Sequence, residues 1–197
     1  GTLRLVGQGG RTMSAPASAA PREEDLGRVR AAVWSLLDAA TRGRDHPWRL
    51  AVLATQGPDG ADARHVVLRE CDVSARVLCV YTDLRSPKVA QLRADPRATL
   101  VCWDPTLGWQ LRLSVHAEVI DQGLDVSSRW ARLRLTRAAQ DYLSPLPPGQ
   151  RRDAPGTASA APAAADATTP HAHFGLLRLH VRAIDWLELH ATGHRRA

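Results

Sequence analysis

The sequence predicts a mainly β protein of the α+β class, an antiparallel barrel with flanking helices, and three observations carry this prediction. Short apolar segments recur along the chain, separated by turn residues such as Gly, Pro and Asp. The clearest segment is 109–118, where apolar residues from Trp109 to Ala117 alternate with polar ones, the period of two of a half-buried strand. The segments follow one another at hairpin spacing, which favours an antiparallel barrel over a parallel wound sheet.

The remaining elements follow from local signals along the chain. Apolar residues at helical spacing predict a helix from 23 to about 42, with Gly43 as its C-cap. A short helix is expected to begin at Ser86 and to end near Pro96, and one or two helices are expected over 124–142. Strands are predicted at 49–55, 63–69, 76–82, 97–103, 109–118, 173–180 and 182–189.

The length of 197 residues suits one domain, which we place at 23–196. Residues 14–21 are rich in Ala, Pro and Ser, and a disordered N-terminal segment is expected at 1–22. Met13 is the only methionine and a natural start, so residues 1–12 are left out of the predicted fold. A low-complexity loop with no apolar face is predicted at about 145–170.

Charge and composition narrow the class of partner. The net charge of +6 comes mostly from arginine, which favours anionic ligands. The basic residues are scattered and aromatic residues are few, so a nucleic-acid platform is unfavoured. The three cysteines lack CxxC spacing and the histidines lack metal-ligand pairing, so we expect no disulfide framework, no metal site and a reducing, cytoplasmic location. The sequence has no apolar run of the roughly 18 residues that a membrane helix needs.

The segment 86–88 is built like an anion site. Ser86 suits an N-cap and Pro87 suits the first helical position. Lys88 in the first turn is opposed by the positive end of the helix dipole, and a bound anion would remove this conflict. On spacing alone, a solvated surface lysine is an equally good interpretation.

Five motifs occur in one order along the chain, at 64–69, 81–82, 86–88, 109–112, and 184–186 with 194–196. In this order they resemble the pyridoxamine 5′-phosphate oxidase-like family of FMN-binding split barrels. The resemblance is closest to a less characterised branch with arginine, here Arg69, where the oxidase proper has lysine. It implies a six-stranded antiparallel split barrel and a homodimer that binds two FMN molecules between its subunits.

The resemblance also implies roles for single residues. Arg64 and Lys88 would hold the FMN phosphate at the Ser86 helix start, with Tyr81 and Thr82 at the phosphate and ribityl chain. The other implied contacts are to the flavin ring: the backbone of Val66 and Val67, Arg69 at the pyrimidine side, Gln110 at the ring edge, and Trp186 and Arg196 from the second subunit.

Two of these assignments are open to more than one interpretation. Arg64 and Arg69 are five positions apart and face opposite sides of a straight strand, so either a bulge intervenes or they act on different parts of the ligand. Trp186 could equally serve ordinary barrel packing.

The implied function is an FMN-dependent oxidoreductase that acts on an unidentified small molecule by hydride transfer at the flavin. No carboxylate pair suits acid–base work, so no catalytic side chain is assigned and the chemistry is the flavin's. Pyridoxamine 5′-phosphate oxidation proper is disfavoured, because the oxidase has an Arg-Leu-His triplet for its substrate and only the histidine, His194, remains at 192–194. In the helix that would bind the substrate phosphate, Arg134 is the one chemically suitable residue. A non-catalytic carrier of FMN or haem also fits the motifs, and a nucleic-acid binder fits them more weakly.

Overall fold

The computed structural model describes residues 25–143, 147–148 and 172–197. The segment 1–22, predicted to be disordered, lies outside these residues, as does nearly all of the predicted loop 145–170. The fold below therefore concerns the predicted domain without that loop.

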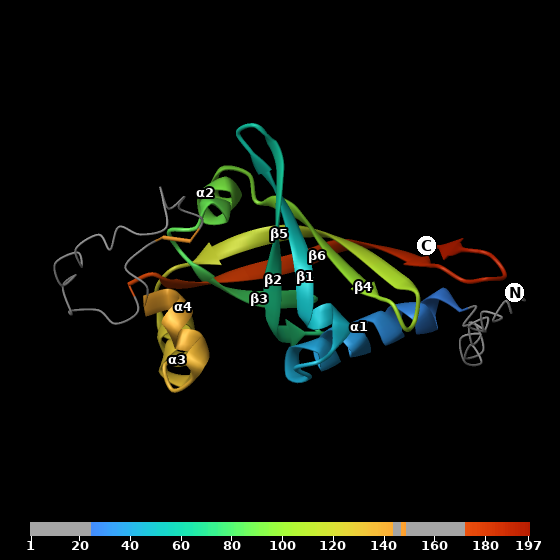
Figure 1. The fold of residues 1–197 in the computed structure, drawn as a ribbon, viewed down its shortest axis with the longest axis horizontal. Helices are drawn as coiled ribbons and strands as arrows, with labels where there is room; N and C mark the ends of the chain where they lie inside the picture. Colours follow the sequence, from blue (N-terminus) through green and yellow to red (C-terminus); the bar gives the residue numbers. More distant parts are fainter. Residues whose placement is uncertain (1–24, 144–146, 149–171) are drawn as a thin grey trace, which may run out of the picture.

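Six strands form a closed antiparallel ring (Figure 1). The sheet runs in the order β3-β2-β1-β4-β5-β6, and pairing between β3 and β6 closes it. The strand bounds are β1 Leu50–Gly57, β2 Gly60–Asp72, β3 Val77–Asp83, β4 Arg97–Asp104, β5 Trp109–Ile120 and β6 Phe174–Glu188. A short β7, Arg195–Arg196, pairs with the end of β6. The predicted six-stranded antiparallel split barrel is confirmed.

The core lies inside this ring because alternate residues of each strand point inward. On β5, Leu111, Leu113, Val115 and Ala117 are buried while the residues between them are exposed, as the period of two predicted. Leu53, Leu68 and Leu100 from β1, β2 and β4 are fully buried in the same cluster. Burial of these side chains is the main source of stability in such a barrel.

Helices cover the barrel at three places (Figure 1). Helix α1, Leu26–Arg42, packs Val33 and Leu37 into the core, and Asp25 caps it by accepting the Gly27 N–H at 2.7 Å. Helix α2, Pro87–Ala94, lies beside the β1–β2 hairpin. The predicted helical region 124–142 consists of α3 Leu124–Leu133, the 3-10 turn η2 Arg137–Ala139 and α4 Gln140–Leu143, and a further turn, η1 Pro47–Arg49, precedes β1. None of the helices in the described ranges is long and apolar enough to cross a membrane.

One prediction about the strands is wrong. The two last strands expected at 173–180 and 182–189 are a single strand, β6. A register shift opposite Ser114 and Val115 leaves Arg182 as an extra residue, because Ala183 and Val181 take the paired positions. A β-bulge absorbs one residue without ending the strand, so the break in the alternation marked a bulge and not a turn.

All three cysteines are free thiols. Cys79 and Cys102 are buried, and Cys71 is half-buried. Burial raises the pKa of Cys71 to about 11 and that of Cys79 and Cys102 to about 12, so these thiols are protonated and unreactive at neutral pH.

Candidate functional site

The start of α2 has the predicted residues in the predicted places, with one difference in bonding. Ser86 is the N-cap residue and Pro87 opens the helix. The Ser86 hydroxyl caps no backbone N–H and instead accepts a hydrogen bond from Nζ of Lys88 at 2.8 Å. Asp83 shapes the preceding turn, since its backbone carbonyl accepts the Ser86 N–H and its carboxylate accepts the Arg85 N–H. The lysine is thereby held against the helix start, not extended into solvent.

Lys88 lies in an unfavourable place for a cation. Burial lowers the pKa of its ammonium, and the positive charge of Arg64 lowers it further, while the Asp83 carboxylate opposes the shift. Arg64 and Lys88 are far apart in sequence, so the fold brings two like charges together at a half-buried position. Convergent cations at a helix N-terminus are the arrangement that binds anions in proteins.

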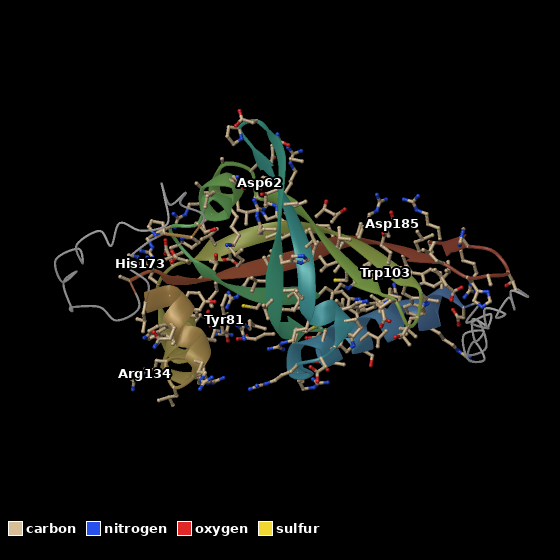
Figure 2. All side chains as sticks on the ribbon, in the orientation of Figure 1. Asp62, Tyr81, Trp103, Arg134, His173 and Asp185 are labelled. Carbon is tan, nitrogen blue, oxygen red and sulfur yellow. The ribbon has the colours of Figure 1, made fainter. Side chains whose placement is uncertain are left out.

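Arg64 is fixed by a polar cluster between the hairpin and α2. Its Nη1 donates to Thr55 Oγ1 at 2.6 Å and to the Leu53 carbonyl at 3.3 Å. Its Nη2 donates to Gln91 Oε1 at 3.0 Å and lies 2.6 Å from Oδ2 of Asp62. Figure 2 places Asp62 on the hairpin next to α2.

The partners of Arg64 are not apparent from the sequence motifs. Asp62 and Arg64 share one face of β2, since they are two residues apart. Thr55 lies opposite Asp62 in the β1–β2 register, and Gln91 comes from α2. Only the strand register and the position of α2 reveal that these side chains meet, although the i, i+2 spacing of Asp62 and Arg64 was a visible signal.

Tyr81 and Thr82 point to opposite sides of β3. Thr82 is almost fully buried. Tyr81 instead donates its hydroxyl to Glu70 at 2.9 Å and packs edge-on against Phe174. Tyr81 is therefore part of a different cluster from Lys88.

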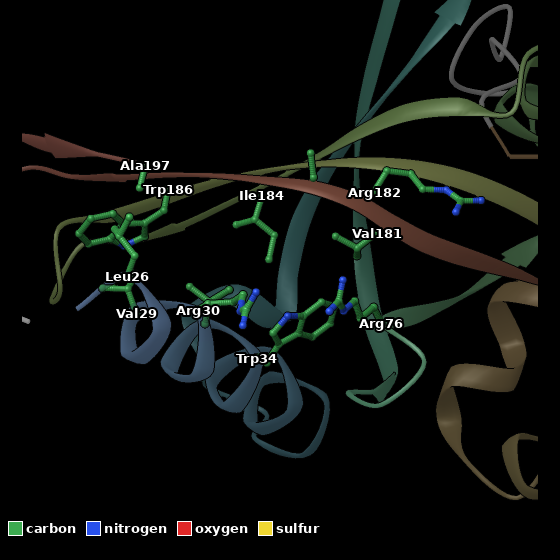
Figure 3. A pocket seen from close by; sticks show the side chains of 12 residues that line it. Leu26, Val29, Arg30, Trp34, Arg76, Val181, Arg182, Ile184, Trp186 and Ala197 are labelled. Carbon is green, nitrogen blue, oxygen red and sulfur yellow. The ribbon is translucent and has the colours of Figure 1, made fainter. Parts of the chain in front are cut away.

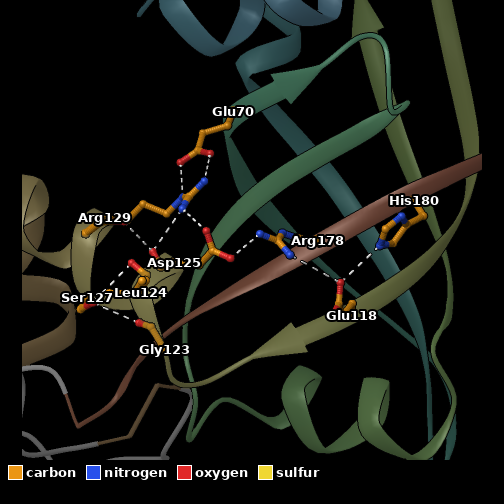
Figure 4. Close-up of polar contacts among 10 residues, drawn as sticks. Glu70, Glu118, Gly123, Leu124, Asp125, Ser127, Arg129, Arg178 and His180 are labelled. Atoms are coloured by element: carbon orange, nitrogen blue, oxygen red, sulfur yellow. Dashed lines mark hydrogen bonds and ion pairs between the residues drawn. The ribbon is translucent and has the colours of Figure 1, made fainter.

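That second cluster ties α3 to the barrel (Figure 4). Arg129 of α3 donates to both carboxylate oxygens of Glu70 at 2.8 Å and pairs with Asp125 at 2.9 Å. Asp125 also pairs with Arg178 of β6 at 2.6 Å. Because each charge has an opposite partner, this network supports structure more than it offers a binding site.

The structure shows on which faces of β2 the side chains of Arg64 and Arg69 lie. A register shift between Leu68 and Glu70 marks a bulge at Arg69. The bulge does not bring Arg69 round to Arg64, because the Arg69 guanidinium lies 5.5 Å from the centre of the Tyr81 ring, on the other face. Of the two flanking valines, Val66 is buried in the core and Val67 is half-buried.

The remaining predicted flavin contacts gather at the other end of β5. Gln110 pairs with Leu187, which in turn pairs with Arg196. In the strand register, Arg64 lies opposite Leu53, and Leu53 is linked through Leu100 to Leu113 of β5. Three strand spacings, about 14 Å, therefore separate Arg64 from β5. Among the described residues, no hydrogen bond or ion pair joins Gln110 or Arg196 to Arg64 or Lys88.

Arg196 and Trp186 are both engaged within their own chain. Arg196 donates twice to Asp185, at 2.9 and 2.6 Å, and Arg112 pairs with the same carboxylate. Trp186 is only 3% exposed and packs edge-on against Trp109. This burial favours the packing interpretation of Trp186 over a flavin contact.

The two candidate substrate residues lie apart from the cation pair. Arg134 is an exposed residue at the C-terminal end of α3, and Figure 2 places it far from Asp62. His194 is exposed in the turn before β7. In the part of the chain that the structure describes, no group of three or more His, Cys, Asp or Glu side chains could hold a metal ion.

Three hollows flank the described part of the barrel. A groove of about 570 Å³ over β1, β4 and β5 shares Thr55 with the Arg64 cluster. A smaller cavity of about 260 Å³ lies between α1 and β6, lined by Trp34, Ile184 and Trp186 among others (Figure 3). The third, of about 350 Å³, is lined by Glu70, Cys79 and Arg129 among others. The first contains Thr55, a hydrogen-bond partner of Arg64.

Comparisons with known proteins agree with this geometry. Residues 31–121 match the family model for the pyridoxamine 5′-phosphate oxidase FMN-binding domain. A pyridoxine/pyridoxamine 5′-phosphate oxidase from Thermosynechococcus vestitus is 36% identical over 86 residues, which is 40% of this chain and only 40% of that protein. The crystal structure of a pyridoxamine 5′-phosphate oxidase-related, FMN-binding protein from Nostoc punctiforme has a TM-score of 0.62 and 25% identity, covering 85% of this chain and 87% of that one. PhzG from Burkholderia lata, in complex with tetrahydrophenazine-1-carboxylic acid, shares the fold with a TM-score of 0.60 and 17% identity, covering 86% and 84% of the two chains.

Proposed function

The chain belongs to the pyridoxamine 5′-phosphate oxidase FMN-binding domain family, as a related branch, and from this we propose that it binds FMN through Arg64 and Lys88 and acts as an oxidoreductase on a small molecule. The observation that carries the proposal is that two cations meet on α2, since Lys88 bonds Ser86 at its start and Arg64 bonds Gln91 one turn further along. A bound phosphate would compensate both charges at once.

The residues at this place fit a phosphate. A phosphate monoester is close to a dianion at neutral pH and is held by several fixed donors. Arg64 offers a guanidinium, Lys88 an ammonium, and Ser86 a hydroxyl at the start of α2. Among the described residues, the Ser86 hydroxyl is the one hydrogen-bond acceptor for Lys88, so the ammonium has room for a stronger partner.

Bound FMN would supply hydride-transfer chemistry at its ring, and the chain would bind and orient it. Gln110, with an amide that can donate and accept, and Arg196 are suited to the polar edge of such a ring. Arg69 at the β2 bulge remains a candidate for the pyrimidine side.

We further propose that the complete site forms between two copies of the chain. Within the described residues of one chain, Gln110 and Arg196 are bonded to neither Arg64 nor Lys88, and three strand spacings, about 14 Å, separate Arg64 from β5. A second copy that presents its Gln110 end to the first chain's Lys88 end would bring the proposed contacts together, and the two-fold symmetry of such a dimer would form two sites.

The test is the absorption spectrum of the purified protein, with mass identification of any released cofactor and the mass of the complex in solution. We expect a flavin spectrum, FMN on release, and a dimer. Arg64→Ala should lose most of the bound FMN and remain folded, whereas Arg93→Ala, which removes an exposed arginine of α2 that pairs with Asp121, should keep it. A haem spectrum would support a haem carrier instead, and a colourless monomer indifferent to added FMN would refute the proposal.

A further inference from the structure

Asp62 stands where an incoming anion would meet Arg64. Its Oδ2 lies 2.6 Å from Nη2 of Arg64 and accepts a hydrogen bond from Nε2 of Gln91 at 2.8 Å. The bond from Gln91, together with the charge of Arg64, lowers the pKa of Asp62 below its usual range. The carboxylate is therefore ionised at neutral pH and already neutralises part of the Arg64 charge.

Most N–H groups of Arg64 are already engaged, which limits how a phosphate can bind to it. A guanidinium has five N–H groups. Nη1 of Arg64 uses its two on Thr55 and the Leu53 carbonyl, and Nη2 faces Gln91 and Asp62. Among the described residues, only the fifth, on Nε, has no partner, and it can supply one N–H of a fork. A fork-like contact with a phosphate needs two parallel N–H groups, so one of these partners has to leave.

Asp62 is the partner that leaves most easily. Thr55 is only 4% exposed, and the Leu53 carbonyl belongs to a strand in the core. The Asp62 side chain is 46% exposed near the end of the hairpin, so it can turn into water, and the one other bond lost is that from the half-buried Gln91 amide. Partly exposed ion pairs of this kind are weak and exchange readily.

We propose that Asp62 is an internal competitor for the phosphate site: its carboxylate holds Arg64 until the phosphate of FMN displaces it. This inference rests on the proposed function and adds a specificity rule to it. A dianionic phosphate monoester outcompetes a single carboxylate because its attraction to the two cations is larger, whereas a ligand of lower charge does not. Asp62 thus sets a minimum charge for the ligand.

The experiment compares equilibrium binding of FMN and of riboflavin, which lacks the phosphate, to the unmodified protein, D62N and D121N. D121N is the matched control, because it removes the same charge from the pair with Arg93 on α2. We expect D62N to bind FMN about three- to tenfold more tightly than the unmodified protein, with D121N unchanged and riboflavin affinity the same in all three.

Three other outcomes would overturn the inference about Asp62. Equal or weaker FMN binding by D62N would overturn the inference, since Asp62 would then position Arg64 and not compete for it. An equal gain in D62N and D121N would reduce the effect to overall charge and overturn it as well. If neither the unmodified protein nor D62N binds FMN, the proposed function fails and the inference falls with it.

Discussion

Replacing Lys88 with methionine should separate binding from stability. Methionine keeps the long side chain and removes the ammonium. In the folded chain this ammonium makes a hydrogen bond to the Ser86 hydroxyl and is repelled by Arg64. The prediction is that K88M loses FMN affinity strongly and keeps the stability of the cofactor-free protein.

The magnitudes follow from these contacts. Without FMN, K88M loses one hydrogen bond to a neutral acceptor, worth about 1 kcal/mol, and gains relief from the burial of a charge beside Arg64. The two effects oppose each other, so we expect the melting temperature to stay within about 3 °C, or to rise. With FMN, the loss of a charge-assisted bond of about 1.5–3 kcal/mol weakens binding about ten- to a hundredfold.

The pH dependence gives an independent readout on the same variant. The pKa of Lys88 is lower in the folded protein than in the unfolded chain, so at pH values between the two, unfolding takes up a proton. Stability of the unmodified protein relative to K88M should therefore rise as the pH increases from the folded pKa towards about 10.4, the unfolded value.

The assay is thermal unfolding without cofactor, together with titration of FMN followed by its fluorescence. R93M is the matched control, because Arg93 is an exposed cation on the same helix that pairs with Asp121. A K88M protein that binds FMN as tightly as R93M, or whose stability falls in step with its affinity, would refute the role given to Lys88.

Two predictions concern residues that stabilise the barrel outside the cation pair. Burial raises the pKa of Glu70, but its hydrogen bonds from Arg129 and Tyr81 outweigh this effect and leave the pKa lowered. We therefore expect E70Q to lower the free energy of unfolding by about 1–2 kcal/mol at pH 7. Since this stabilisation is present above about pH 4.3 and is lost as the pH falls through the folded pKa, the difference in urea unfolding should disappear in acid; a constant difference would contradict the ion pair. Gly108→Ala should cost about 1–3 kcal/mol, because φ is +66° and the added Cβ would lie 2.5 Å from the Leu189 carbonyl oxygen. Gly43→Ala, at φ −83°, is its control, and equal stability of the two variants would show that the left-handed conformation carries no cost.

The barrel could be predicted because its strands bury one face each. The alternation at 109–118 fixed both the type and the orientation of β5. Where the pattern is interrupted, the sequence does not distinguish a turn from a bulge, so the predicted strands 173–180 and 182–189 leave a gap at Val181, next to the bulge at Arg182. The strand β2 likewise extends past its predicted end at 69 because the bulge at Arg69 lets pairing resume at Glu70.

The candidate site was predictable only in part, for a related reason. The cations at 64 and 88 are visible as motifs, but the neighbours of Arg64 depend on register and on where α2 docks. Asp62 and Gln91 have no motif of their own, and their meaning comes from the contact with Arg64. For Trp186, the motif position does not reveal that its side chain is buried in its own chain, so its predicted flavin contact stays a prediction.

The arrangement of charges also explains why the site should respond to its ligand. The cofactor-free chain holds Arg64 with a carboxylate that is partly exposed and leaves Lys88 against a hydroxyl. Both contacts are weak compared with those that a phosphate would make. Closer pairing of either cation would stabilise the empty chain and reduce the gain on binding, because affinity depends on the difference between the two states. A half-satisfied pair of cations is therefore what a reversible phosphate site requires, and a fully paired cluster such as Glu70 with Arg129 and Asp125 is what a structural anchor requires.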